Sequence, residues 1–252
     1  MTIDLNCDLG EGGPHDAMLM PLVSSANIAC GGHAGDEGTM AAAVDLARRH
    51  GVAIGAHPGY RDAAHFGRRD VPLTAAATAD LVLHQVAALA RIAGTLLHHV
   101  KLHGALYNRV SHDTESAAAV VAALASHWPG LVVYALADSP FVALARSAGL
   151  AVAAEAFLDR GYAADGALLP RSSPGAVICD PRAAAVRARR FVQVGLVTSV
   201  AETDLGIRPD TLCIHGDGAD PVSLARAVRD ALDQAGVAVR PPAGRRARTE
   251  SG

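Results

Sequence analysis

The sequence predicts a distorted parallel β/α barrel of about seven strands, formed by one domain at residues 1–240 and followed by a disordered tail at 241–252. Three observations favour this class. Short apolar runs alternate with longer helical patterns, which is typical of parallel βα units. The chain has 252 residues, a length that suits a closed barrel. No G-x-G-x-x-G turn follows the first run, which disfavours a Rossmann-type sheet.

The expected strands are short runs rich in apolar and β-branched residues, each bounded by turn residues. They are TIDLNCDL, SANIAC, VAIGAH, LLHHVKLH, LVVYALA, AVAAEAF, AVI and TLCIHG, at residues 2–9, 25–30, 52–57, 96–103, 131–137, 151–157, 176–178 and 211–216. Seven or eight such runs are enough to close a barrel.

The expected helices lie between these runs, and glycine or Pro-Gly ends each of them. They cover Glu37–His50, Thr74–Ala93, Asp113–His127, Ser139–Ala148, Asp180–Val194 and Pro221–Ala235. Thr74 is a suitable N-cap for the second helix, since its hydroxyl can accept a hydrogen bond from a free backbone N–H.

Alternation within the strands predicts a polar barrel interior. In IDLNCD, the residues Asp4, Asn6 and Asp8 share one face of the strand and the apolar residues share the other. In HVKLH, Lys101 lies on the polar face. Because the outer helices cover the apolar faces, the polar faces must point inward. A usual barrel interior holds branched aliphatic side chains, so we expect a wide barrel with a wet cleft down its middle.

Polar motifs also gather where the strands end. CDLGE, CGGHAGD, GAHPGY, KLHGALYN and CIHGDG follow the first, second, third, fourth and last runs. His33, His57, His103 and His215 therefore occupy equivalent positions next to glycine or alanine. Ligands bind and chemistry occurs at the C-terminal rim of β/α barrels. One histidine is more often structural than functional, but four at the same position predict a site.

Composition narrows the classes of partner and the compartment. The net charge is −3, which gives no general basic surface for nucleic acid or membrane. No apolar run approaches the roughly 20 residues of a membrane span, and no signal peptide is evident after Met1. The four cysteines contain no C-x-x-C pair, which is typical of reduced, buried thiols. We therefore expect a cytoplasmic protein.

Metal ligation is left open by the sequence. His99 and His103 have H-x-x-x-H spacing, but on a strand they would lie about 13 Å apart, too far to share one ion. Carboxylates that could bind Mg²⁺ or act in acid–base chemistry are Asp8, Glu11, Asp36 and Asp217. They could equally cap loops. In HFGRRD, Arg68 and Arg69 could clamp a phosphate or a carboxylate, or be solvated.

The chain has a single lysine, Lys101, among 22 basic residues. Lysine is a compact charge whose pKa is tunable, whereas arginine is a planar, permanently charged fork. Lys101 is therefore expected at an inward position where arginine does not fit. The alternative is a chance effect of arginine-rich codon usage. We expect Lys101→Arg to keep the fold and its melting temperature and to lose most of the turnover that partner subunits support.

Taken together and in order, the motifs resemble the LamB/YcsF family, which provides the A subunit of the ATP-hydrolysing 5-oxoprolinase. DLNCDLGEG, SANIACGGHAGDEGTM, GAHPGYRDAAHFGRRD, HVKLHGALYN, AEAFLDRGYAADGALLPRSSPGAVI and TLCIHGD carry the resemblance, from about residue 3 to 235. It implies a barrel related to glycoside hydrolases and deacetylases. It also implies ATP-coupled opening of 5-oxo-L-proline to L-glutamate together with partner subunits B and C.

Residues that match the family pattern are the implied site residues. The catalytic candidates are Asp8, His57, Lys101 and His103, and the substrate-binding candidates are Asn6, Glu11, Asn27, His33, Asp36, Arg68, Asn108, Glu155, Asp159, Arg160, His215 and Asp217. The family usually has proline where this chain has Leu102, and the segment GGPHDAMLMPLV looks shorter than is typical. Alternation points Leu102 outward, so the site should survive.

The implied reaction needs several kinds of polar group. A lactam carbonyl is a poor electrophile, and phosphorylation of its oxygen by ATP activates it toward water. Such a route requires cations for the phosphoryl charge, a base, an acid and an anchor for the substrate carboxylate. We assign the phosphoryl or oxyanion charge to Lys101, the base to Asp8 or His103, and the anchor to Arg68 or Arg160. ATP is the expected co-substrate, and Mg²⁺ is a candidate cofactor. The alternatives are a metal-dependent carbohydrate or amide deacetylase and a non-catalytic ligand-binding subunit.

Overall fold

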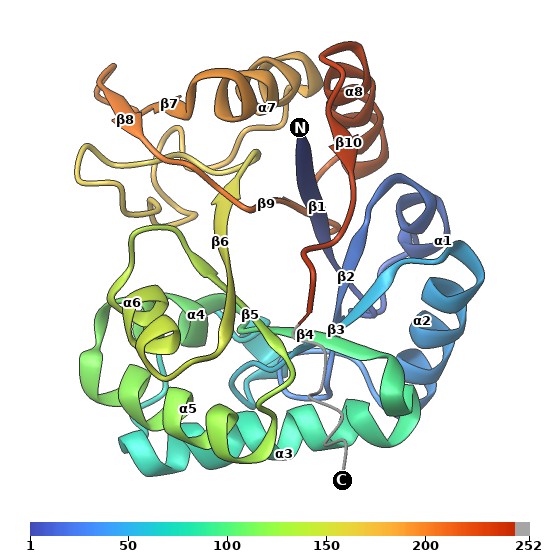
Figure 1. The fold of residues 1–252 in the computed structure, drawn as a ribbon, viewed down its shortest axis with the longest axis vertical. Coiled ribbons are helices and arrows are strands. Elements are labelled where there is room, and N and C mark those ends of the chain that lie inside the picture. Colours follow the sequence, from blue (N-terminus) through green and yellow to red (C-terminus); the bar gives the residue numbers. More distant parts are fainter. Residues whose placement is uncertain (245–252) are drawn as a thin grey trace, which may run out of the picture.

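A closed barrel of seven parallel strands forms the centre of the molecule in the computed structural model, which describes residues 1–244. The strands surround the middle of the view in Figure 1. In barrel order they are β1 (Thr2–Leu9), β2 (Ser25–Ala29), β3 (Ala53–His57), β4 (Leu97–Lys101), β5 (Val132–Leu136), β6 (Ala151–Phe157) and β9 (Thr211–His215). β9 pairs with both β6 and β1 and so closes the ring. The predicted barrel class is confirmed.

The six helices that the sequence predicts cover the barrel from outside (Figure 1). They are α2 (Glu37–His50), α3 (Ala75–Ala93), α5 (Thr114–His127), α6 (Pro140–Ser147), α7 (Pro181–Val194) and α8 (Pro221–Gln234). All six predicted helices are present, with ends shifted by at most one residue. The side chain of Thr74 accepts a hydrogen bond from the backbone N–H of Ala77, as its N-cap role requires. Gly51 and Gly195 end α2 and α7 in the left-handed conformation.

Several elements escaped the sequence prediction. The helix α4 (Gly104–His112) begins directly after His103 and so adjoins the strand-end motif. Other additions are α1 (Asp16–Leu19), the hairpin β7 (Leu196–Thr198) and β8 (Asp204–Gly206), and β10 (Ala238–Val239), which pairs with the start of β1. Short 3₁₀ turns lie at η1 (Met20–Leu22), η2 (Ala63–His65) and η3 (Gly94–Leu96).

The run AVI at 176–178 is not a barrel strand, which corrects the prediction. Val177 forms only an isolated bridge with Arg160. The backbone of Gly161 donates to Ala176, and that of Ile178 donates to Asp159, so the run folds back on the loop after β6. Local antiparallel pairing therefore satisfies its backbone groups, and the barrel closes through β9 instead.

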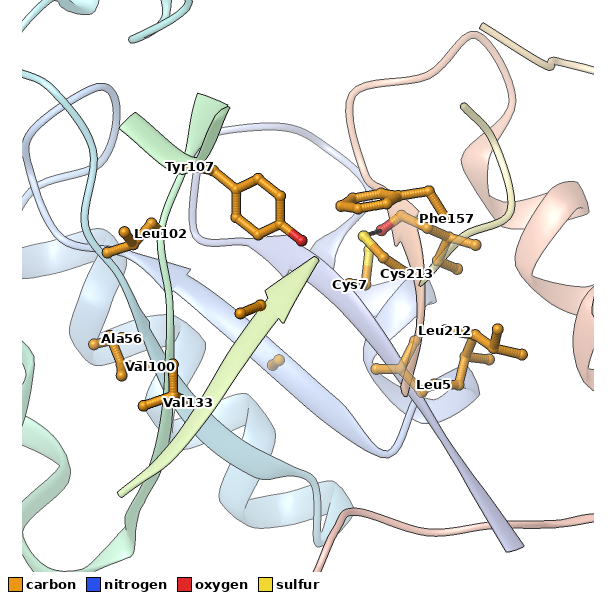
Figure 2. Close-up of a cluster of buried hydrophobic side chains, with 14 of the residues drawn as sticks. Leu5, Cys7, Ala56, Val100, Leu102, Tyr107, Val133, Phe157, Leu212 and Cys213 are labelled. Carbon is orange, nitrogen blue, oxygen red and sulfur yellow. Dashed lines mark hydrogen bonds between the residues drawn. The ribbon is translucent and has the colours of Figure 1, made fainter. Parts of the chain in front are cut away.

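The apolar faces of the strands point away from the barrel axis, as alternation predicts. Ala56, Val100 and Val133 lie on the adjacent strands β3, β4 and β5 and form part of the hydrophobic core (Figure 2). Leu102, one residue beyond the end of β4, belongs to the same core but also lies at the wall of the rim cavity, so alternation alone did not predict its contact with the site. Val82, on α3, is also a fully buried member of this core.

The last described residues of the chain return to the barrel. His98 Nε2 lies 2.9 Å from the carbonyl oxygen of Pro242, so the first residues of the predicted tail contact the base of β4. The remainder of that tail, 245–252, lies outside the described residues. Among residues 1–244, none of the helices combines the length and the apolar character that crossing a membrane requires.

Candidate active site

The lower part of the barrel interior is polar but closed. The carboxylate of Asp4 accepts hydrogen bonds from Ser24, Ser25 and Thr211 at 2.6–2.7 Å. All four side chains are buried. Thr211 also receives a bond of 2.7 Å from Asn6. Buried polar groups are tolerated when they are bonded in this way. Side chains that satisfy one another fill this level, so the wet cleft expected down the middle is wrong.

A second closed network lies around His99 and Asn27. His99 Nε2 is 2.9 Å from Asn27 Oδ1, and its ring stacks on Tyr134 at 4.1 Å. Gly55 leaves room for that ring, because a Cβ there would lie 2.0 Å from His99 Nε2. His99 is therefore a structural group of the interior. His103 has a different partner, His57.

Lys101 connects this interior to the rim. Its ammonium lies 2.9 Å from Asp8 Oδ1, 3.0 Å from Glu155 Oε1 and 3.2 Å from Asn6 Oδ1. The side chain is only 2% exposed. Burial alone would lower the pKa of Lys101, but the neighbouring acceptors, Asp8 foremost, raise it well above its usual value. Lys101 is a desolvated ammonium group with acceptors for all three of its hydrogens.

Asp8 lies near the end of β1, where the interior opens. Its Oδ1 accepts from Asn27 and Lys101, and its Oδ2 is 3.3 Å from His57 Nε2 and 3.8 Å from His215 Nε2. Burial would raise the pKa of this carboxyl, yet His57 and Lys101 outweigh burial and hold it well below the ordinary value. Asp8 is thus an ionised acceptor with one oxygen directed at two histidines.

His33, His57 and His103 form one cluster beside Asp8. The rings of His33 and His103 stack at 3.5 Å, and His57 meets both edge-on. Burial, followed by the neighbouring His57, lowers the pKa of His33 to about 3 and that of His103 well below its usual value. Glu11 lies 3.0 Å from His33 Nε2. Burial, then Asp8, raises the pKa of Glu11 well above normal.

His215 approaches Asp8 from the other side, at the end of β9. Its Nδ1 lies 2.8 Å from Asp159 Oδ2, and its backbone N–H donates to the same carboxylate. Burial would raise the pKa of Asp159, but His215 lowers it. A buried carboxylate on Nδ1 fixes the ring and leaves Nε2 facing Asp8.

A cavity of about 460 Å³ opens over these groups. Asp8, His57, Lys101, His103 and His215 form part of its wall. The remaining wall consists of Arg68, Leu102, Gly104, Ala105, Tyr107, Asn108, His112, Phe157, Arg160, Leu168, Pro170, Arg171 and Ser172. Tyr107 and Phe157 meet edge-to-face at 5.7 Å (Figure 2). The size suits a small organic ligand.

Three arginines give the cavity a cationic side. Arg68 and Arg171 both pair with Asp217, the latter at 3.5 Å. The guanidinium of Arg160 donates to the backbone oxygens of Ala176 and Leu169, at 3.2 and 2.5 Å. Arg160 is therefore committed to the loop after β6. Arg68 is the more available of the two anchors expected from the sequence.

The structure brings most of the predicted site residues to one rim, and it places others elsewhere. The residues at the cavity wall are Asp8, His57, Arg68, Lys101, His103, Asn108, Arg160 and His215. Those behind the wall, in contact with it, are Asn6, Glu11, Asn27, His33, Glu155, Asp159 and Asp217. Asp36 belongs to neither group, because its exposed carboxylate caps α2 by accepting from the backbone of Thr39.

A four-carboxylate Mg²⁺ site is therefore not formed by the described residues. Asp36 acts as a helix cap, and Asp217 is paired with arginines. The sequence reading also missed Tyr107, whose hydroxyl donates to Glu155 Oε2 at 2.8 Å, and Arg171. Both lie within motifs singled out above, KLHGALYN and PRSSPG. Their presence in these motifs could have identified both as candidate site residues.

Fold and rim define a parallel β/α-barrel protein with a polar cavity at the C-terminal ends of its strands. The LamB/YcsF family model matches residues 3–247, and the chain belongs to this family. It is 46% identical over 247 residues to the 5-oxoprolinase A subunit of Syntrophobacter fumaroxidans, covering 95% of this chain and 98% of the relative. It is 48% identical over 248 residues to the protein of that name from Heliobacterium modesticaldum, with 95% and 98% covered.

A solved structure agrees with the fold. The crystal structure of the lactam utilization protein from Thermus thermophilus superposes with a TM-score of 0.88 at 46% identity. The superposition covers 95% of this chain and 99% of the other. The family resemblance read from the motifs is confirmed.

Proposed function

We propose that this chain is the A subunit of an ATP-dependent 5-oxoprolinase, which opens the 5-oxo-L-proline lactam to L-glutamate together with subunits B and C. ATP is the co-substrate in this proposal. The names of the full-length relatives support its role as one subunit of such an enzyme. The main support for the chemistry is the position of Asp8. Its carboxylate is ionised and lies at the cavity wall, and its Oδ2 atom faces His57 and His215.

Asp8 and His215 are the proposed proton-transfer groups. Asp8 Oδ2 belongs to an ionised carboxylate and lies between His57 and His215 at the cavity. It is therefore suited to accept a proton from the attacking water. Asp159 holds His215 through Nδ1, which leaves Nε2 facing the same space. In its doubly protonated form, His215 can donate the Nε2 hydrogen to the departing lactam nitrogen and so become neutral. Arg68 is the proposed anchor for the substrate carboxylate.

Lys101 has a positioning role in this proposal. The sequence suggested direct contact with a phosphoryl or oxyanion group. The hydrogens of its ammonium already have acceptors on Asp8, Glu155 and Asn6. Lys101 therefore orients Asp8 and keeps its carboxylate ionised, which is the protonation state that a general base requires.

The test is ATP-dependent glutamate release from 5-oxoproline by this chain with and without subunits B and C. We expect turnover with ATP and all three subunits, and little with this chain alone. Asp8→Asn and His215→Gln should each lower kcat by roughly 10²–10⁴, the usual contribution of a positioned acid or base. Asp45→Asn, on the exposed face of α2, is the matched control.

Two results would contradict the proposal. One is glutamate release that is unaffected by Asp8→Asn in a variant that melts like the wild type. The other is amide hydrolysis by the isolated chain without ATP, which is the behaviour of the metal-dependent deacetylase alternative. Calorimetric binding of 5-oxoproline without turnover in the complete mixture would favour the ligand-binding subunit instead.

A further inference from the structure

Two imidazole rings at the rim face one another in an arrangement that neutral histidines cannot satisfy alone. His57 Nε2 and His103 Nδ1 lie 2.9 Å apart. At this distance, one of the two nitrogens must offer a hydrogen to the other, or a cation must lie beside both.

The remaining nitrogen of each ring shows where its hydrogen is. His57 Nδ1 lies 2.8 Å from the carbonyl oxygen of Lys101, and His103 Nε2 lies 2.9 Å from that of Phe66. A carbonyl oxygen only accepts, so both of these nitrogens carry a hydrogen. A neutral imidazole has only one. The two facing nitrogens therefore both present lone pairs, and a positive charge has to bring them together.

Glu11 adds a third ligand atom to this pair. Its Oε1 lies 3.6 Å from His103 Nδ1 and 3.0 Å from His33 Nε2. The ligand atoms of Glu11, His33, His57 and His103 all lie within 4.8 Å of one another. A bridging proton would serve the two imidazoles only, whereas a metal ion would also satisfy the carboxylate.

We propose that His57 Nε2, His103 Nδ1 and the Glu11 carboxylate bind one divalent transition-metal ion of the Zn²⁺ type, with His33 orienting Glu11. Two imidazoles and one carboxylate suit Zn²⁺ or its neighbours better than Mg²⁺ or Ca²⁺, which prefer oxygen ligands. Tetrahedral Zn²⁺ at its usual bond lengths holds ligand atoms about 3.3 Å apart. The pairs at 2.9 and 3.6 Å lie on either side of that spacing.

The surroundings also match a metal centre. Metal-bound histidines usually donate their other N–H to a carbonyl or a carboxylate, as His57 and His103 do. Both rings line the cavity, so an ion held by them would be reachable by a bound ligand. Asp8 Oδ2, 3.3 Å from His57 Nε2, is a further oxygen next to the site.

Metal binding by the full chain tests this inference without ATP, substrate or the partner proteins. A negative result is therefore distinct from failure of the proposed reaction. Chelator-treated protein is titrated with Zn²⁺ by calorimetry, and we expect one ion per chain. His103→Ala and Glu11→Gln should weaken binding by at least about 100-fold, because each removes a ligand. The control is His127→Ala, which changes an exposed histidine on α5.

Co²⁺ provides a second readout that needs no variant and so remains informative if a substitution prevents folding. The wild-type chain should give the intense visible bands of four- or five-coordinate Co²⁺, and Zn²⁺ should displace them. Absence of stoichiometric Zn²⁺ binding, unchanged affinity in a folded His103→Ala protein, or the spectrum of hydrated Co²⁺ would each overturn the inference and leave a bridging proton as the cation.

Discussion

The closed interior and the open rim of this barrel use the same residue types for different purposes. In the interior, Asp4, Asn6 and His99 are at most 1% exposed, and each is bonded to neighbouring side chains. At the rim, Asp8 and His215 keep atoms directed toward a cavity. Polarity of a strand face therefore does not identify a catalytic group. The rim differs because some of its side-chain oxygen and nitrogen atoms face the cavity, where a ligand can bond to them.

Lys101 lies on the boundary between these two regions. It contacts Asn6 and Glu155 on the interior side and Asp8 on the rim side. If the interior supports stability and the rim supports activity, substitution of Lys101 should lower both. Substitutions in one region alone should separate stability from activity.

The largest effect is expected for Lys101→Met. This change leaves Asp8 and Glu155 as buried carboxylates without their counter-charge, and breaking a buried ion pair from one side typically costs about 3–5 kcal/mol. The free energy of unfolding, measured with urea, should fall by that amount, and turnover with the partner subunits should be lost. Arg49→Met, which breaks an exposed pair with Asp45 on α2, is the control and should leave the midpoint unchanged.

Lys101→Arg keeps the positive charge and so tests whether the Lys101 site accepts a wider cation. The sequence led us to expect an intact fold and an unchanged melting temperature. The burial of Lys101 at 2% exposure argues instead that the wider guanidinium will also destabilise the protein, by about 1–3 kcal/mol, as overpacking usually does. A Lys101→Arg protein that melts like the wild type would show that this pocket adapts, and would restore the first expectation.

Gly55→Ala should disturb the interior directly and reach the rim only through Asn27, which also donates to Asp8. The added Cβ would lie 2.0 Å from His99 Nε2, so the ring must leave Asn27 and its stack on Tyr134. Overpacking and a lost buried hydrogen bond together predict a loss of about 2–3 kcal/mol in unfolding free energy. Gly130→Ala is the matched control, because nothing lies within 4 Å of a Cβ there. Equal melting temperatures for the two variants would refute the argument.

Local sequence signals were sufficient for most of the fold. Helix ends followed from glycine stops and from caps such as Thr74, and the strand faces followed from alternation. The AVI run failed because its length and composition fit a strand, whereas its pairing depends on a distant loop turning back on itself. The helix α4 was missed because a functional-looking motif, HGALYN, also forms its first turns.

The sequence predicted where in the barrel the site lies, but not which role each of its residues has. Position after a strand brought His57, His103 and His215 together correctly. The same signal could not tell that Asn27 links His99 to Asp8 behind the cavity wall, or that Asp36 turns outward to cap a helix. Those outcomes depend on which side chain from another strand meets each group. Alternation within one strand does not predict these contacts between strands.

Arg68→Met should change the rim and leave the interior intact. Arg68 lies at the cavity wall, and within residues 1–244 it pairs with the partly exposed Asp217 and lies 4.8 Å from the centre of the Phe66 ring. Both contacts are near the surface, so the loss of Arg68 should cost little stability. As the proposed anchor of the substrate carboxylate, its removal should raise KM for 5-oxoproline by about tenfold, or ~1.4 kcal/mol. Arg146→Met, at an exposed pair with Asp210, is the control in the same kinetic assay. Unchanged KM would transfer the anchoring role to another cation of the cavity, such as Arg171.

The smallest effect is expected for Asp36→Ala, a residue that the family pattern placed among the binding groups. Its carboxylate and Thr39 form a reciprocal capping box at the start of α2. Loss of the cap should lower the melting temperature slightly and leave KM and kcat unchanged. Asp36→Asn should recover most of the stability, because asparagine also caps helices well. A rise in KM would instead return Asp36 to the binding site.

The pH dependence of this small effect separates a cap from a ligand contact. The backbone N–H of Thr39 is the main reason that the pKa of Asp36 lies below its usual value. For a carboxyl group whose folded-state pKa is depressed, the stabilisation is present above the unfolded-state pKa, about 3.9, and is lost as pH falls through the folded-state value. The difference in melting temperature between the wild type and Asp36→Ala should thus be constant from pH 8 to about pH 5 and narrow below about pH 4. A difference that grows on acidification would mean that the carboxylate is not stabilised by the helix end.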